Sequence, residues 1–135
     1  MPVSPPPNRA ARPVALVAVS VIEVLEALGL LGFAISTVVG ATGRYPLQTV
    51  GVAGTFVVAA ALLALVAVGT LRARSWSRTP GIVWQVVQAF VGIYALQGQG
   101  GQLFAVAAIL PAIVAIVLLF TRPVREATAR STGRA

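Results

Sequence analysis

The chain of 135 residues contains no cysteine, histidine, aspartate or lysine. Without cysteine it has no disulfide, no thiol nucleophile and no thiolate metal site. Without histidine and aspartate, most metal sites, haem ligation and nucleophile–base pairs cannot be assembled. The sequence therefore predicts a non-catalytic protein with no cofactor and no bound metal.

Charge is also scarce, because charged residues make up only 10% of the chain, against roughly a quarter in an ordinary soluble domain. Almost none of them fall in four apolar segments, residues 14–39, 47–71, 81–97 and 103–121. An apolar run of about 18 or more residues is typical of a membrane-spanning helix. The predicted fold class is therefore all-α, a four-helix transmembrane bundle, and the rest of the chain is too short for a soluble domain.

The segments outside these spans are short. Residues 1–13 are rich in proline and predict a disordered tail, and residues 122–135 are basic and predict a second one. The first span is longer than the apolar part of a secretory signal, so we expect it to be retained as a helix. Residues 40–46 predict a turn, and the short glycine-rich loop at residues 96–102 predicts that the third and fourth spans are antiparallel neighbours.

Nine of the ten arginines fall on one side of the predicted membrane, and only Arg44 falls on the other. The positive-inside rule then places both termini in the cytoplasm, with the protein in the cell membrane. We expect the net charge of +7 to meet anionic lipid headgroups and not nucleic acid. Trp76, Trp84 and Tyr45 flank span ends, where amphipathic rings favour the interface, so they are predicted interface anchors.

The first span carries two glutamates, Glu23 and Glu26, in an otherwise apolar run. Its fifteen Leu, Ile, Val and Phe residues favour insertion by about 5–9 kcal/mol, whereas a central charged residue costs about 2.5–3.5 kcal/mol. Two charged glutamates would therefore cancel most of the driving force. We expect each one to bind a proton or to find a partner on a neighbouring helix.

Depth along the helices indicates what those partners are. At about 1.5 Å per residue, Glu23 lies about 14 Å from the cytoplasmic end of its span and Gln88 about 12 Å, with Gln85 somewhat shallower. Pro111 reaches a similar depth in the fourth span, where its missing N–H leaves a backbone carbonyl without a donor. The sequence therefore predicts Glu23 and Gln88 within hydrogen-bond reach.

The first span also has a strip of small residues beside Glu26. At 100° per residue, Glu26 shares a strip about 80° wide with Phe33 and several small residues, and Gly32, Ser36 and Gly40 are spaced four apart. Such series allow close approach of helices in membranes. The predicted helix-packing residues are Gly29, Gly32, Ser36 and Gly40. We expect Glu26 to point into the bundle near Gly29.

Two interpretations of Glu23, Glu26, Gln88 and Gln85 stay open. They form a polar core that fixes a subunit or self-associating bundle, as a homo-oligomer or beside a membrane-protein partner. Alternatively, they form a proton or cation site in a small coupled transporter, since ionisable residues inside membranes commonly mark such pathways.

The stretch "RSWSRTPGIVWQVVQAFVGIYALQGQGGQ", residues 74–102, resembles a group of small four-span integral membrane proteins from high-GC Gram-positive bacteria. The shared pattern is a basic loop, Pro80, the run Val83-Trp84-Gln85 with Gln88, and a glycine-rich turn. That group has no assigned activity, so the resemblance implies a membrane location.

The stretch "VIEVLEA", residues 21–27, resembles the first span of small multidrug resistance transporters. That resemblance implies a four-span proton-coupled exporter of cationic compounds, with Glu23 as the essential carboxylate. The chain departs from the family in its second glutamate, in the pattern of its third span and in its strong charge bias.

Overall fold

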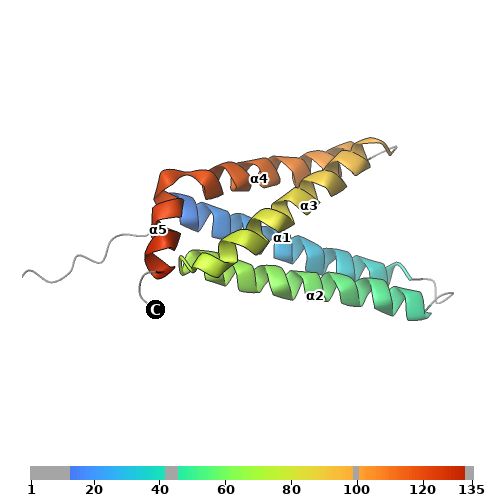
Figure 1. The fold of residues 1–135 in the computed structure, drawn as a ribbon. Coiled ribbons are helices and arrows are strands. Elements are labelled where there is room, and N and C mark those ends of the chain that lie inside the picture. Colours follow the sequence, from blue (N-terminus) through green and yellow to red (C-terminus); the bar gives the residue numbers. More distant parts are fainter. Residues whose placement is uncertain (1–12, 42–45, 99–100, 133–135) are drawn as a thin grey trace, which may run out of the picture.

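The protein is a bundle of helices in the computed structural model, which describes residues 13–41, 46–98 and 101–132. The elements are α1 (Val14–Val39), α2 (Pro46–Leu71), the short 3-10 turn η1 (Ser75–Ser77), α3 (Arg78–Leu96), α4 (Gln102–Phe120) and α5 (Arg122–Thr132) (Figure 1). The described residues contain no strand, and the predicted all-α bundle is confirmed. The four predicted spans agree with α1 to α4 within three residues at every end.

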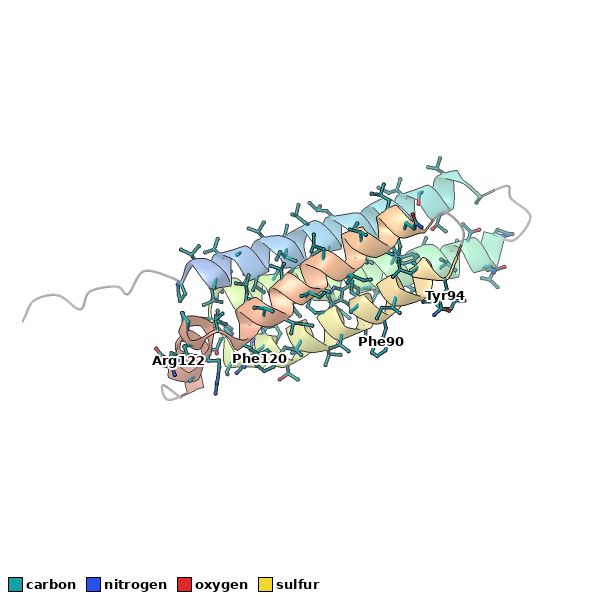
Figure 2. The ribbon with its side chains drawn as sticks, turned by 90° about the horizontal axis from the view of Figure 1, so that it is seen from above. Phe90, Tyr94, Phe120 and Arg122 are labelled. Atoms are coloured by element: carbon teal, nitrogen blue, oxygen red, sulfur yellow. The ribbon has the colours of Figure 1, made fainter. Side chains whose placement is uncertain are left out.

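The four long helices are long and apolar enough to cross a membrane, so the chain is a small multi-pass membrane protein. The shorter two, of 19 residues each, reach about 29 Å, close to the roughly 30 Å of a bilayer core. Large apolar side chains mostly point outward, as Phe90 and Tyr94 do on α3, whereas buried apolar positions are mostly alanine (Figure 2). Small residues inside and large ones outside are typical of helices packed in lipid.

The helices form two antiparallel pairs, α1 with α2 and α3 with α4, and most close backbone contacts lie within a pair. Gly92 marks a close approach of α3 to α4, because a Cβ there would lie 2.6 Å from Ile109 Cγ1 and 3.1 Å from the carbonyl oxygen of Ala105. The two pairs meet near α5 and diverge toward the opposite end of the bundle (Figure 1).

The end of the bundle near α5 carries most of the described arginines, and we call it the basic end. Arg72 and Arg74 follow α2, Arg78 opens α3, and Arg122 and Arg125 belong to α5. Four of these five side chains are exposed, and that of Arg78 is half-buried. The guanidinium of Arg78 lies 5.4 Å from the ring centroid of Phe120, the last residue of α4.

Helix α5 is a correction to the sequence prediction, which made residues 122–135 a disordered tail. Val124 is fully buried in a cluster with Leu16, Val19 and Leu119, and Ala127 packs against the same cluster. A helix of 11 residues is marginal by itself in water, so this packing against α1 and α4 holds α5 in place. The prediction was wrong because it considered only the basic composition of this segment and not the short apolar side formed by Val124 and Ala127.

Some sequence predictions lie outside the described residues. These are the conformation of the tail at residues 1–12, Tyr45 as an interface anchor, and the middle of the two predicted turns at residues 42–45 and 99–100.

Candidate functional site: the Glu26 pocket

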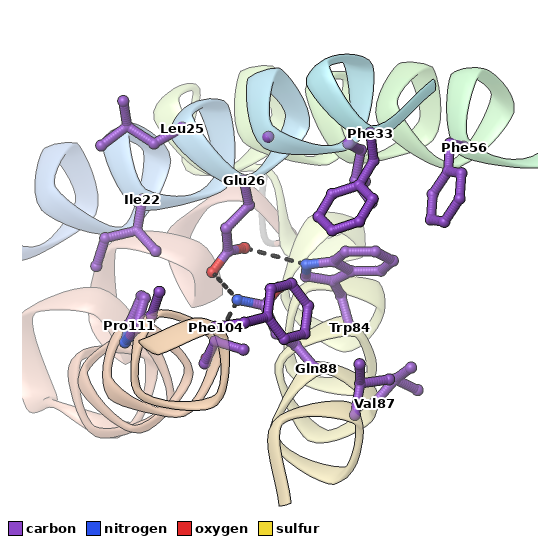
Figure 3. A pocket seen from close by; sticks show the side chains of 15 residues that line it. Ile22, Leu25, Glu26, Phe33, Phe56, Trp84, Val87, Gln88, Phe104 and Pro111 are labelled. Atoms are coloured by element: carbon purple, nitrogen blue, oxygen red, sulfur yellow. Dashed lines mark hydrogen bonds between the residues drawn. The ribbon is translucent and has the colours of Figure 1, made fainter. Parts of the chain in front are cut away.

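Glu26 points from the middle of α1 toward α3, where three neutral N–H groups donate to its carboxylate. Trp84 Nε1 donates to Oε2 at 3.0 Å and Gln88 Nε2 donates to Oε1 at 3.0 Å (Figure 3). Gln85 Nε2 also donates to Oε2, at 2.9 Å. The three donors share one face of α3, because helical positions i, i+1 and i+4 lie within about 100° of one another. Neutral donors stabilise a carboxylate without cancelling its charge.

The partner predicted for Gln88 is wrong by one turn of α1. We expected Gln88 beside Glu23, but its Nε2 binds Glu26 and also donates to the carbonyl oxygen of Ala108 at 3.3 Å. Helix α3 begins at Arg78, three residues before its predicted start, so Gln88 lies about 4.5 Å farther along the helix than we assumed. The carbonyl that Gln88 binds belongs to Ala108, one residue beyond Ala107, whose carbonyl Pro111 leaves without a donor.

Glu23 lies one turn from Glu26 in a different environment. It is fully buried between helices, its Oε1 accepts a long hydrogen bond of 3.5 Å from Thr70 Oγ1 of α2, and its Oε2 has no partner among the described residues. Gly81 of α3 covers the carboxyl so closely that a Cβ there would be 2.9 Å from Oε1. Both glutamates therefore face protein, as predicted, but their hydrogen-bond donors come from different helices, α2 for Glu23 and α3 for Glu26.

A pocket of about 440 Å³ lies between the two helix pairs, with Glu26 on its wall. Gln88 and Trp84 are its other main polar members, and Gly29 also lines it, as predicted for the surroundings of Glu26. The rest of the wall is apolar, and Glu23 does not contribute to it. A concave apolar site of roughly 300–1,000 Å³ with a few convergent polar groups is typical of small-molecule binding.

Aromatic rings from several helices line this pocket. Phe33 of α1 lies 5.6 Å from Phe56 of α2 and 5.6 Å from Phe104 of α4, measured between ring centroids. All three rings line the pocket together with the Trp84 indole (Figure 3). The faces of aromatic rings carry negative partial charge and attract cations.

Trp84 is the site residue whose role the sequence prediction missed. We expected it to be an interface anchor, but its indole lies in the pocket and donates to Glu26. Its spacing of four residues from Gln88 places both on one helical face, and this signal could have revealed its role. Trp76, in contrast, is partly exposed in η1 at the basic end, where its interface role stays a prediction.

The predicted packing of Gly29, Gly32, Ser36 and Gly40 is wrong for contacts within this chain. A Cβ at Gly29 or Gly32 would meet no atom within 4 Å, and Ser36 is exposed, its hydroxyl donating to Phe33 of its own helix. Helix α1 instead buries another face, which includes Ala27 and Ala34. The series of small residues therefore does not mark the face of α1 that packs within this chain.

Comparison with known protein families, curated proteins and solved structures finds no match for the chain. The two resemblances noted from the sequence therefore stay predictions. Among the described residues, no group of three or more acidic, histidine or cysteine side chains could hold a metal ion. The chemistry of the site comes from two carboxyl groups, two side-chain amides and one indole.

Proposed function

We propose that this protein is a small membrane transporter that binds a hydrophobic monovalent cation in the Glu26 pocket and exchanges it for a proton. One observation carries the proposal. A carboxylate held by three neutral donors forms part of the wall of an aromatic-lined pocket of about 440 Å³.

The charge of the helices supports a cationic ligand. Helices α1, α2 and α4 contain no basic residue, and the single one in α3, Arg78, lies in its first turn against Phe120. A buried charge without a counter-ion is costly inside a bilayer. A cation in the pocket supplies the missing positive charge, and a proton taken up by the glutamate pair replaces it when the cation leaves.

The pocket wall favours an aromatic or otherwise hydrophobic cation. Phe33, Phe56, Phe104 and Trp84 present rings to the cavity, and a cation over such a ring gains about 0.5–2 kcal/mol. The remaining wall is apolar, so a ligand that carries its charge on an apolar body leaves few polar groups unsatisfied.

A second candidate function follows from the direction of the same hydrogen bonds. All three cross from α3 to α1, and these two helices make few close backbone contacts. Glu26 would then fix the helix pairs in a non-catalytic subunit or self-associating bundle without any ligand. Interhelical hydrogen bonds in membranes average about 0.6 kcal/mol, so three contribute about 2 kcal/mol.

Trp84 fluorescence tests the proposed function. With Trp76→Phe, the chain keeps Trp84 as its single indole, and addition of tetraphenylphosphonium to the protein in lipid nanodiscs should change the emission saturably. The reason is that the indole lines the pocket beside Glu26. Trp84→Phe, which keeps only Trp76 at the basic end, is the matched control and should give no saturable change. Absence of binding across a panel of aromatic cations would favour the second candidate.

We also propose that the basic end faces the cytoplasm at the cell membrane and contacts anionic headgroups. The exposed arginines Arg72, Arg74, Arg122 and Arg125 support this orientation. A phosphatase that is active only outside the cytoplasm should therefore be inactive when fused to the C-terminus. The same reporter inserted after Gly98, at the opposite end, should be active. High activity at the C-terminus would contradict the orientation.

A further inference from the structure

Glu23 is a buried ionisable group that the pocket does not use. Its side chain is fully buried, its Oε2 has no hydrogen-bond partner within the part of the chain that the structure describes, and Thr70 Oγ1 donates to its Oε1 at 3.5 Å. Glu26, one turn away, has three donors at 2.9–3.0 Å. The same residue type therefore sits in two contrasting environments on one helix.

These environments suit different protonation states. A buried ionised carboxylate requires several donors or a counter-ion, and Glu26 has the donors whereas Glu23 does not. A carboxylic acid carries its own O–H, so a proton on Oε2 removes the charge and makes that oxygen a donor. The structure therefore offers one site arranged for a carboxylate and another arranged for a carboxylic acid.

The position of Glu23 separates it from the pocket and connects it to the basic end. Thr70 is the last but one residue of α2, so its hydroxyl joins Glu23 to that end of the bundle. On the other side, Gln85 lies one helical turn after Gly81 on α3, is fully buried, and donates to Glu26 while its Oε1 has no partner. Glu23 thus lies between the basic end and the cation pocket.

We propose that the two glutamates divide the exchange, with Glu23 as the proton site and Glu26 as the cation site. This inference rests on the proposed function and assigns its two ions to separate residues. In the resting state Glu23 holds a proton and Glu26 is ionised, so the pair carries a charge of −1. When a monovalent cation binds at Glu26, the proton leaves a Glu23 oxygen for water at the basic end, and the sum of two carboxylates and one cation is again −1.

Coulomb attraction is the physical reason for the coupling. A cation at Glu26, one turn away, stabilises the ionised form of Glu23 and so favours loss of its proton, whereas a proton lost without a bound cation would leave two like charges buried in the membrane, which is costly. The groups that face Glu23 are Thr70 from α2 and Gly81 from α3, with Glu26 on its own helix and the apolar Leu119 of α4 beside Gly81. None of these neighbours brings a compensating positive charge.

Proton release on cation binding tests the division of roles. Wild-type protein in weakly buffered detergent solution should release close to one proton per bound tetraphenylphosphonium, and its affinity should rise with pH by up to about tenfold per unit, since linkage is reciprocal. Glu23→Gln should bind the cation with an affinity within a few-fold of wild type but release no proton and show no dependence on pH. Glu126→Gln removes a carboxyl on α5 and is the matched control, expected to behave as wild type.

Each result decides between the alternatives. Proton release that persists in Glu23→Gln, or loss of cation binding in that variant, overturns the assignment while leaving the proposed function standing. Failure of the wild-type protein to bind any cation removes the proposed function.

Infrared spectroscopy tests the proton site without any ligand. A carboxylic acid C=O band should be present in the wild type at neutral pH, persist in Glu26→Gln and disappear in Glu23→Gln. A missing band in the wild type, or one that survives Glu23→Gln, refutes the proton site. If Glu23→Gln does not accumulate, Thr70→Val examines the same group, because loss of the donor hydroxyl should shift the band to higher wavenumber, and an unmoved band contradicts the proposal.

Discussion

Replacement of Glu26 by glutamine is expected to weaken tetraphenylphosphonium binding by roughly 30-fold or more, because removal of one partner from a buried charge pair costs about 2–5 kcal/mol. The bundle should stay folded. The new amide oxygen accepts from Trp84 and Gln85, and Gln88 can turn its amide to accept from the new NH₂ group, with loss of its bond to Ala108. Equilibrium dialysis measures the affinity, and thermal unfolding in detergent measures the fold.

Comparison of Glu26→Gln with Glu26→Leu distinguishes a cation site at Glu26 from a purely structural role of this residue. Leucine removes all three hydrogen bonds, whereas glutamine keeps a hydrogen-bonding group. If Glu26 only fixes the helix pairs, glutamine should preserve every measurable property and leucine should loosen α3 from α1. Unchanged cation binding in Glu26→Gln would contradict a cation site at this carboxylate.

Gly92→Leu is expected to destabilise the bundle by about 3 kcal/mol or more, at the upper end of overpacking effects. A side chain at this position meets Ile109 and the backbone carbonyl of Ala105, and backbone cannot move aside as a flexible side chain can. The close packing of α3 against α4 should therefore be lost, and the pocket wall that these two helices form should be disrupted with it. Thermal unfolding and accumulation in the membrane measure the effect.

Gly54→Leu is the matched control for this substitution. Gly54 lies within α2, and a Cβ there would meet no atom within 4 Å. Leucine also favours a helix by about 1 kcal/mol relative to glycine, so the control should be neutral or slightly stabilising. Similar behaviour of the two variants would show that the close α3–α4 contact does not set the stability.

The spans were predictable from the sequence because lipid imposes a simple rule of length and low charge. Four apolar segments with almost no charged residues predict four helices, and the insertion cost of Glu23 and Glu26 predicts that both face protein. The beginning of α3 was three residues in error, since Arg78 and Thr79 read as loop residues although they form its first turn.

The partners of the glutamates were not predictable, because depth along a helix does not determine its rotation or inclination. A shift of three residues moves a side chain by about 4.5 Å, enough to exchange Glu23 for Glu26 as the partner of Gln88. The place of Phe56 and Phe104 in the pocket wall was not predictable either, because the sequence of an apolar helix does not distinguish a side that lines a pocket from a side that faces lipid. Both properties depend on how the helix pairs diverge.

The division of the bundle into two helix pairs sets an order for assembly during synthesis. Glu23 finds its donor, Thr70, within the first pair, whereas every donor to Glu26 belongs to α3. A newly inserted α1–α2 hairpin therefore already bonds one carboxyl and leaves the other without a donor in hydrocarbon, which is costly. Insertion of the second hairpin supplies the donors and removes that cost. The hydrogen bonds to Glu26 therefore favour docking of the α3–α4 hairpin on the α1–α2 hairpin.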